Sequence, residues 1–72
     1  MFFKNKIKYR DVGRIANRYW YYGKGVSACG IVKENGLFRW YAYAYGNIEH
    51  QCRNFTCFKD CIHSLLEYVN KE

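Results

Sequence analysis

The stretch GVSACGIVKENGLFRWYAYAYG (residues 25–46) decides the fold, because it predicts a β-hairpin with a defined register. Asn35-Gly36 separates two runs that are rich in β-branched and aromatic residues. Both positions of a tight type I′ turn need a positive φ, so Asn-Gly between such runs is the strongest short signal for a hairpin. With these two residues as the loop, the strands pair so that Ala28 lies opposite Tyr43.

The two faces of this hairpin differ in character, because successive side chains of a strand point to opposite sides. One face combines Trp40 with small alanines, which leaves a shallow trough that a helix can approach closely. The other face carries a row of tyrosines, whose rigid rings and polar tips tolerate water and suit partner binding. The trough face is predicted to hold Cys29, Ile31, Phe38, Trp40, Ala42 and Ala44. The opposite face is predicted to hold Val26, Ala28, Val32, Arg39, Tyr41, Tyr43 and Tyr45.

An amphipathic helix of about fourteen residues is predicted after the hairpin, with Thr56 as its N-cap. Its apolar positions recur at intervals of three and four, which places them in one stripe along the helix. The stripe needs an apolar partner, and the trough beside Trp40 is the surface that fits. Its members are Phe58, Cys61, Ile62, Leu65, Leu66 and Val69.

A third strand is predicted through IEHQCR (residues 48–53), after a turn at Gly46-Asn47. Two registers are compatible with the sequence. A loop of two residues sends Cys52 to the tyrosine side, whereas a loop of three sends it toward Trp40, because one step of register exchanges the faces.

The opening stretch FKNKIKYR (residues 3–10) alternates apolar or neutral residues with four cations. This alternation predicts an edge strand with Phe3, Ile7 and Tyr9 facing inward and the cations facing outward.

From Arg10 onward the spacing becomes that of a helix. Arg10, Arg14 and Arg18 recur every four residues and would stack three guanidinium groups along one side. Gly13 weakens such a helix, so a second extended segment over residues 10–22 is the alternative.

These elements fit one α+β domain spanning residues 1–72, in which a small antiparallel sheet of three to four strands packs on one C-terminal amphipathic helix. So short a chain buries only about 60% of the surface that its unfolded form exposes, and it therefore depends on large buried side chains. Aromatic residues make up 21% of the chain and meet that need.

Positive charge is concentrated at the start of the chain. The net charge is +6, and residues 1–18 contain six Lys and Arg residues against Asp11 alone. Such a field attracts phosphate backbones or an acidic protein surface and raises the rate of encounter with either. The alternative is that these cations keep an aromatic-rich chain soluble.

No catalytic site is predicted, and no cofactor is expected. The two histidines form no recognisable arrangement with a nucleophile. Gly23-Lys24-Gly25 lacks the remainder of a phosphate-binding loop, and paired carboxylates are missing.

The spacing of five residues is compatible with a zinc site: His50, Cys52, Cys57, Cys61 and His63. The stretch has no C-x-x-C pair, and His63 projects about 200° around the helix from Cys61. We therefore expect buried free thiols and no metal, with a zinc- or disulfide-stapled interaction module as the alternative.

A cytoplasmic protein without a membrane partner is expected. No apolar run approaches the roughly 18 residues that span a bilayer. The start MFFKNKIKYR lacks the apolar core and cleavage site of a secretory signal.

From the hairpin to the C-terminus, the order strand, Asn-Gly turn, strand, Gly turn, strand, helix resembles the sheet-plus-helix modules of the AP2 and integrase-arm type. FTCFKDCIHSLLEYV (residues 55–69) is similar to their closing Phe-Thr and helix. The basic and aromatic DNA-facing strand motif of that family is not evident, so no residue roles are carried over. In size, in its lack of catalytic groups and in its mixture of Lys, Asn and Tyr, the chain also resembles short early proteins of phages and mobile elements. Many of these, including anti-CRISPR proteins, inhibit host machinery.

The expected function is that of a non-catalytic, basic binding protein of the phage inhibitor type. It would occupy a site on a host protein or nucleoprotein complex that handles nucleic acid or serves defence. The alternative is direct binding of DNA or RNA through the same residues. A monomer and a homodimer are both compatible with the sequence. The residues expected to steer association are Lys4, Lys6, Lys8, Arg10, Arg14 and Arg18. Those expected to anchor the partner are Arg39, Tyr41, Tyr43 and Tyr45.

Overall fold

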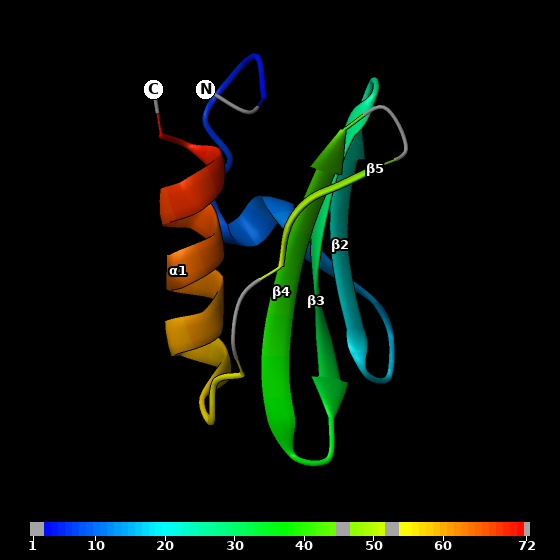
Figure 1. Cartoon of the computed structure of the whole chain (residues 1–72), viewed down its shortest axis with the longest axis vertical. Coiled ribbons are helices and arrows are strands. Elements are labelled where there is room, and N and C mark those ends of the chain that lie inside the picture. Colours follow the sequence, from blue (N-terminus) through cyan, green and yellow to red (C-terminus); the bar gives the residue numbers. More distant parts are fainter. Residues whose placement is uncertain (1–2, 45–46, 52–53, 72) are drawn as a thin grey trace.

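The computed structural model describes residues 3–44, 47–51 and 54–71, and gives the backbone alone for 47–51. A five-stranded antiparallel sheet and one C-terminal helix form two layers (Figure 1). The strand order is β1-β2-β3-β4-β5, so each strand pairs with its neighbour in sequence. The strands are β1 (Gly13–Ala16), β2 (Tyr19–Lys24), β3 (Ser27–Glu34), β4 (Leu37–Ala44) and β5 (Asn47–Gln51). The helices are the short 3₁₀ helix η1 (Tyr9–Asp11) and α1 (Phe58–Val69).

The β3–β4 hairpin has the predicted turn and register. Asn35 and Gly36 both adopt positive φ angles, of 53° and 77°. Pairing then runs without interruption from Glu34 opposite Leu37 to the far end of the hairpin, and Ala28 lies opposite Tyr43. The turn chemistry of two residues therefore determines which side chains of both strands face the helix.

The core lies between the sheet and α1, where the sequence placed it. Trp40 is only 2% exposed, and its indole Nε1 donates a hydrogen bond to Ser64 Oγ on α1 at 3.0 Å. Its ring also lies 5.3 Å from the Tyr68 ring. The buried residues of the core are Phe3, Ile7, Val12, Cys29, Ile31, Trp40, Ala42, Cys61, Ile62, Leu65 and Val69.

The C-terminal helix confirms the predicted stripe and the α+β fold class. Phe58 and Leu66 pack half-buried at the edges of the stripe, and its other members are fully inaccessible. The helix begins one residue later than expected, because Cys57 rather than Thr56 is the N-cap, with an extended backbone at φ −124° and ψ 131°.

The predicted edge strand at residues 3–10 is wrong. This segment follows the helix layer and ends in η1, and within the described chain it pairs with no strand (Figure 1). Phe3 and Ile7 are buried as predicted and the cations are exposed, but Tyr9 is 52% exposed.

The segment forms no strand because a side chain supplies the hydrogen bonds that a neighbouring strand would otherwise provide. The Ile7 amide donates to Asn70 Oδ1 at 2.8 Å, and Asn70 Nδ2 donates to the Ile7 carbonyl oxygen at 2.8 Å. Asn70 caps the C-terminus of α1. One amide group therefore satisfies both backbone polar groups of Ile7 and holds the segment on the helix layer.

The predicted helix from Arg10 is also wrong, and the extended alternative is confirmed. Residues 13–24 form the β1–β2 hairpin, so the three arginines do not stack on a helix. Pairing with β3 sets Trp20 opposite Ile31, where it packs against the core. This burial favours the strand over the helix in a segment whose local sequence is compatible with both. The added hairpin extends the sheet to five strands, beyond the three to four expected.

β5 follows neither of the two simple registers. Asn47 pairs with Ala44, and Ile48 pairs with Tyr43, but an irregularity follows and His50 pairs with Ala42. A β-bulge of this kind changes register within a strand. The two predicted registers differ in the face to which Cys52 points, and Cys52 lies outside the described residues.

None of the helices in the described chain has the length and apolar character needed to cross a membrane.

Replacing Asn70 with Ala should lower the free energy of unfolding by about 2 kcal/mol, because it leaves the amide and the carbonyl of Ile7 without their partners. Urea denaturation of the purified proteins measures the change. Asn54→Ala is the matched control, since Asn54 is exposed. Equal stability of the two variants would show that the Asn70 amide does not hold the opening segment.

Candidate functional site

The sheet face that points away from α1 carries a cluster of tyrosines. The strand register arranges its residues in three rows across β2, β3 and β4. Two tyrosines come from β2 and two from β4, and β3 contributes small residues between them. We call this surface the tyrosine face, and its members are Tyr19, Tyr21, Gly23, Ala28, Gly30, Val32, Arg39, Tyr41 and Tyr43.

Two glycines allow the rings to lie flat on the sheet. A Cβ added at Gly30 would come within 2.6 Å of the Tyr41 hydroxyl and within 2.6 Å of the Trp20 carbonyl oxygen. The Tyr21 ring covers Gly23 in the same way. Glycine in a strand interior often marks such a close approach, and here it makes the tyrosine face low and even.

The phenols on this face contact one another. The rings of Tyr41 and Tyr43 stack at a centroid distance of 5.9 Å with an interplanar angle of 13°. Tyr43 also shares a side-chain hydrogen bond with Tyr21, which links β4 to β2 across the central strand. The rings are therefore pre-arranged before any partner arrives, which lowers the entropy lost on binding.

This clustering raises the pKa of two of the phenols. The hydrogen bond with Tyr21 is the main cause for Tyr43, and burial and neighbouring phenols add to it. Burial is the main cause for Tyr41, with contributions from Tyr21, Cys29 and Tyr19. Both groups therefore remain neutral hydrogen-bonding phenols to a higher pH than an ordinary tyrosine does.

The tyrosine face is open to solvent in the described part of the chain. Tyr19 and Tyr21 are 44% and 37% exposed, and Tyr41 and Tyr43 are half-buried. The opening segment packs on the opposite face, where the Phe3 ring lies 5.2 Å from Tyr22. Within the described residues, α1 covers that same opposite face and no other helix or strand covers the tyrosines (Figure 1).

Arg39 lies at the end of the tyrosine face nearest the Asn35-Gly36 turn. Its guanidinium forms an ion pair with Glu34 at 3.1 Å, and its Nε is buried without a hydrogen-bond partner among the described residues. Both side chains of the pair are partly exposed, so the pair contributes little to stability. Arg39 is the one charged residue among the members of the tyrosine face.

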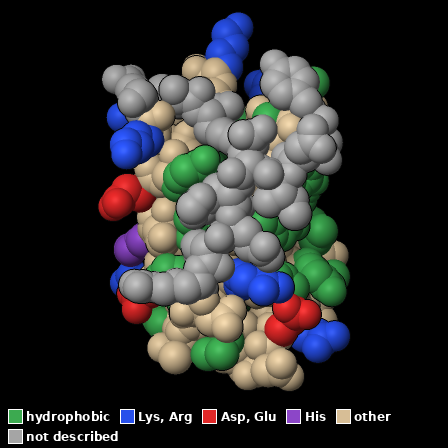
Figure 2. All heavy atoms as spheres, viewed as in Figure 1, with side chains coloured by type: hydrophobic (Ala, Val, Ile, Leu, Met, Phe, Trp, Pro, Cys, Tyr) green, Lys and Arg blue, Asp and Glu red, His purple; other side chains and the backbone are tan. Residues whose placement is uncertain are grey.

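The predicted cations do not form one row with the tyrosines. Lys4, Lys6, Lys8 and Arg10 are exposed along the opening segment on the helix layer. On the face that Figure 2 shows, Lys and Arg side chains are scattered, with acidic side chains near some of them. The structure therefore separates four of the six expected steering residues from the expected anchor.

The other two cations lie on the β1–β2 hairpin. The Arg14 guanidinium is 5.8 Å from the centroid of the Trp20 ring and donates a hydrogen bond to Asn17 Oδ1 at 2.8 Å. Arg18 is exposed in the turn between the two strands. Arg14 is thus engaged with its own chain, whereas Arg18 directly precedes the tyrosine face at Tyr19.

Sequence reasoning missed Tyr19 and Tyr21 as members of the site. The alternation of Tyr19, Tyr21 and Gly23 before the Gly25 turn was the available signal, and the helical spacing of other residues obscured it. Tyr41, Tyr43 and Arg39 share one face as predicted, and Tyr45 lies outside the described residues.

The thiols are distributed between the core and the surface. Cys29 is a fully buried free cysteine, Cys61 is fully buried, and Cys57 is an exposed free cysteine. Burial raises the pKa of the Cys29 thiol to about 12, which makes it a poor nucleophile. Among the described residues, no three His, Cys, Asp or Glu side chains are close enough to hold a metal ion. Cys52 and the side chain of His50 lie outside that description.

Comparison with protein-family models gives no match, and searches of curated proteins and of solved structures give no significant match either.

Gly30→Ala should lower the free energy of unfolding by about 1–3 kcal/mol, because the new methyl group meets both the Tyr41 hydroxyl and the backbone oxygen of Trp20. Thermal or urea denaturation measures this loss. Gly13→Ala is the control, since a Cβ at Gly13 meets nothing within 4 Å. Equal effects of the two substitutions would contradict the close approach of Tyr41 to β3.

The phenol cluster should make stability fall at alkaline pH. The folded chain holds the Tyr43 proton above the ordinary pKa of 10.0, at which the unfolded chain releases it. The stabilisation is therefore complete below about pH 10 and is lost as the pH rises through the higher folded pKa. Urea denaturation between about pH 8 and pH 11 should show a shallower decline for Tyr43→Phe than for the original chain. Tyr9→Phe, outside the cluster, should leave the decline unchanged, and a similar decline in all three proteins would contradict this role of Tyr43.

Proposed function

We propose that this chain is a non-catalytic binding protein that docks its tyrosine face on a protein partner. The observation that carries the proposal is the open cluster of four tyrosines with Arg39 at its end. Tyrosine and arginine are enriched among residues that dominate binding energy, and the centre of an interface is poor in charge. The tyrosine face has this composition.

The placement of the cations favours a protein over nucleic acid as the partner of this face. Proteins that bind single strands combine stacking rings with cations that follow the phosphate backbone beside them. Lys4, Lys6, Lys8 and Arg10 lie on the other layer and cannot serve phosphates of a strand stacked on the tyrosines. A net charge of +6 would still steer the chain toward an acidic partner surface.

The resemblance to short inhibitors of phages and mobile elements supplies the partner class. We propose an acidic surface of a host complex that handles nucleic acid or serves defence. The chain would act by occupying a site on that complex, which requires no catalytic group.

Direct binding of DNA or RNA is the second candidate, because Arg18 directly precedes the exposed Tyr19 at the edge of the tyrosine face. Fluorescence anisotropy with a labelled single strand, measured over a range of salt concentrations, tests it. Binding that weakens steeply with salt supports this candidate, and no binding at low salt removes it.

Tyr43→Ala should weaken binding of the protein partner by at least about fivefold and change stability much less than the substitution of a core aromatic residue. The partner is first captured from nuclease-treated host lysate and purified, and its affinity is then measured by calorimetry. Tyr9→Ala is the matched control, since Tyr9 is exposed but lies off the tyrosine face. A captured partner that binds both variants equally well, or that is lost on nuclease treatment, would contradict the proposal.

A further inference from the structure

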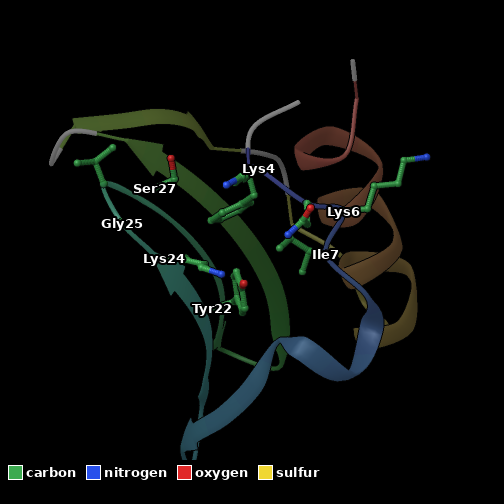
Figure 3. Close-up of a pocket in the computed structure, with 10 residues that line it drawn as sticks. Lys4, Lys6, Ile7, Tyr22, Lys24, Gly25 and Ser27 are labelled. Atoms are coloured by element: carbon green, nitrogen blue, oxygen red, sulfur yellow. The ribbon is translucent and has the colours of Figure 1, made fainter.

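A cavity of about 310 Å³ opens between the opening segment and the β2–β3 turn (Figure 3). One wall is formed by residues 3–7, and the other by Tyr22 and residues 24–27. Tyr22 and Lys24 alternate with the residues of the tyrosine face along β2, so the cavity lies on the opposite side of that strand. It is therefore separate from the surface proposed above.

Two lysines from opposite walls direct their ammonium groups toward this cavity. Figure 3 shows the side chains of Lys4 and Lys24 extending toward the opening, whereas that of Lys6 extends away from it. The hydroxyl group of Ser27 lies at the rim. The elements that carry Lys4 and Lys24 are distant in sequence, so the fold itself brings the two charges together.

Neither ammonium group is neutralised within the described chain. None of the described residues that line the cavity is Asp or Glu. Of the described acids, Asp11 accepts a hydrogen bond from the Lys8 amide, and Glu34 pairs with Arg39. Unpaired cations that face a common cavity create a positive potential there, which concentrates anions.

The interior of the cavity is apolar. Phe3 and Ile7 are 6% and 4% exposed, and the Phe3 ring meets Tyr22 edge-on at 5.2 Å. Val26 is 56% exposed and adds an apolar side chain near the opening. Small-molecule sites combine such apolar walls with a few convergent polar groups, in cavities of about 300 Å³ or more.

The wall that carries Lys4 is fixed in place. The double hydrogen bond between Ile7 and Asn70 ties it to the end of α1, and burial of Phe3 and Ile7 anchors it on the core. A fixed wall sets the separation of the two backbone segments that carry the lysines, so only their side chains need to be ordered when an anion binds.

We propose that this cavity binds a small phosphate monoester, with the phosphate between Lys4 and Lys24 and a flat apolar body against Tyr22 and Val26. A phosphate monoester carries a charge of about −1.5 to −2 at neutral pH, which nearly matches the charge of two ammonium groups. A carboxylate carries only one negative charge and would leave one ammonium group without a counter-charge. Lysine binds phosphate as a compact point charge, and the Ser27 hydroxyl can donate a further hydrogen bond.

Titration of the ¹⁵N-labelled chain with phenyl phosphate, a phosphate monoester with a flat apolar body, followed by NMR, tests this inference. We expect saturable shifts of the amides of Gly25, Val26 and Ser27, with little change at Tyr41 and Tyr43. Phenyl phosphate should bind at least about threefold more tightly than inorganic phosphate, because only the ester has an apolar body, and phenol, which lacks the phosphate, should bind much more weakly. Equal affinity for the ester and for either fragment would overturn the proposal.

Charge-removing variants with a matched control localise the site. Lys4→Gln and Lys24→Gln should each weaken binding by about threefold or more, and the double variant by about tenfold. Lys6→Gln removes the same charge from the same segment, but its side chain points away, so it should have a clearly smaller effect. All three lysines are exposed, and circular dichroism should show unchanged folding. An equal loss in all three single variants would indicate general attraction to a basic chain and would overturn the site.

Discussion

The register of the β3–β4 hairpin is the constraint on which the rest of the structure depends. Asn35 and Gly36 adopt the positive φ angles of a two-residue turn, and this fixes every pair between the two strands. A shift by one residue would turn Trp40 toward solvent and Tyr41 toward α1. The core under the helix and the tyrosine face are therefore two results of the same turn.

The parts of the fold that follow from local chemistry could be predicted from the sequence. The Asn-Gly turn needs no information beyond its own residues, and the stripe on α1 follows from helical spacing alone. Both appear as expected, and the α+β class follows from them. Local sequence does not show which distant residue a segment will contact. The wrong predictions, for residues 3–10 and 10–22, concern segments whose structure depends on such contacts.

The opening segment illustrates this limit. Alternation indicates an extended backbone, which Lys8 adopts with φ −101° and ψ 160°, but residues 3–5 form a bend and residues 9–11 a 3₁₀ helix. It does not indicate what supplies the hydrogen bonds, and the neighbour is the side chain of Asn70 rather than a strand. For residues 13–24, burial of Trp20 against Ile31 and Phe58 outweighs a helical spacing that the chain also displays. Half of the tyrosine cluster was missed for that reason.

The two candidate surfaces use opposite sides of β2. Tyr19 and Tyr21 contribute to the tyrosine face, while Tyr22 and Lys24 line the lysine cavity. Charge is divided in the same way, because the tyrosine face has Arg39 alone and the cavity gathers Lys4 and Lys24. The basic character of the sequence is thus a property of particular regions rather than of one uniform surface.

The bond between Ile7 and Asn70 joins positions 63 residues apart, whereas each strand of the sheet pairs with the next one in sequence. Contacts between sequence neighbours close short loops and form early, but a contact between distant positions waits for a long loop to close. We therefore expect the meander to assemble first and the beginning of the chain to dock last, after the final turn of α1 exists. Residues 3–7 are synthesised before the sheet and α1, yet of these elements they would be the last to reach their native place.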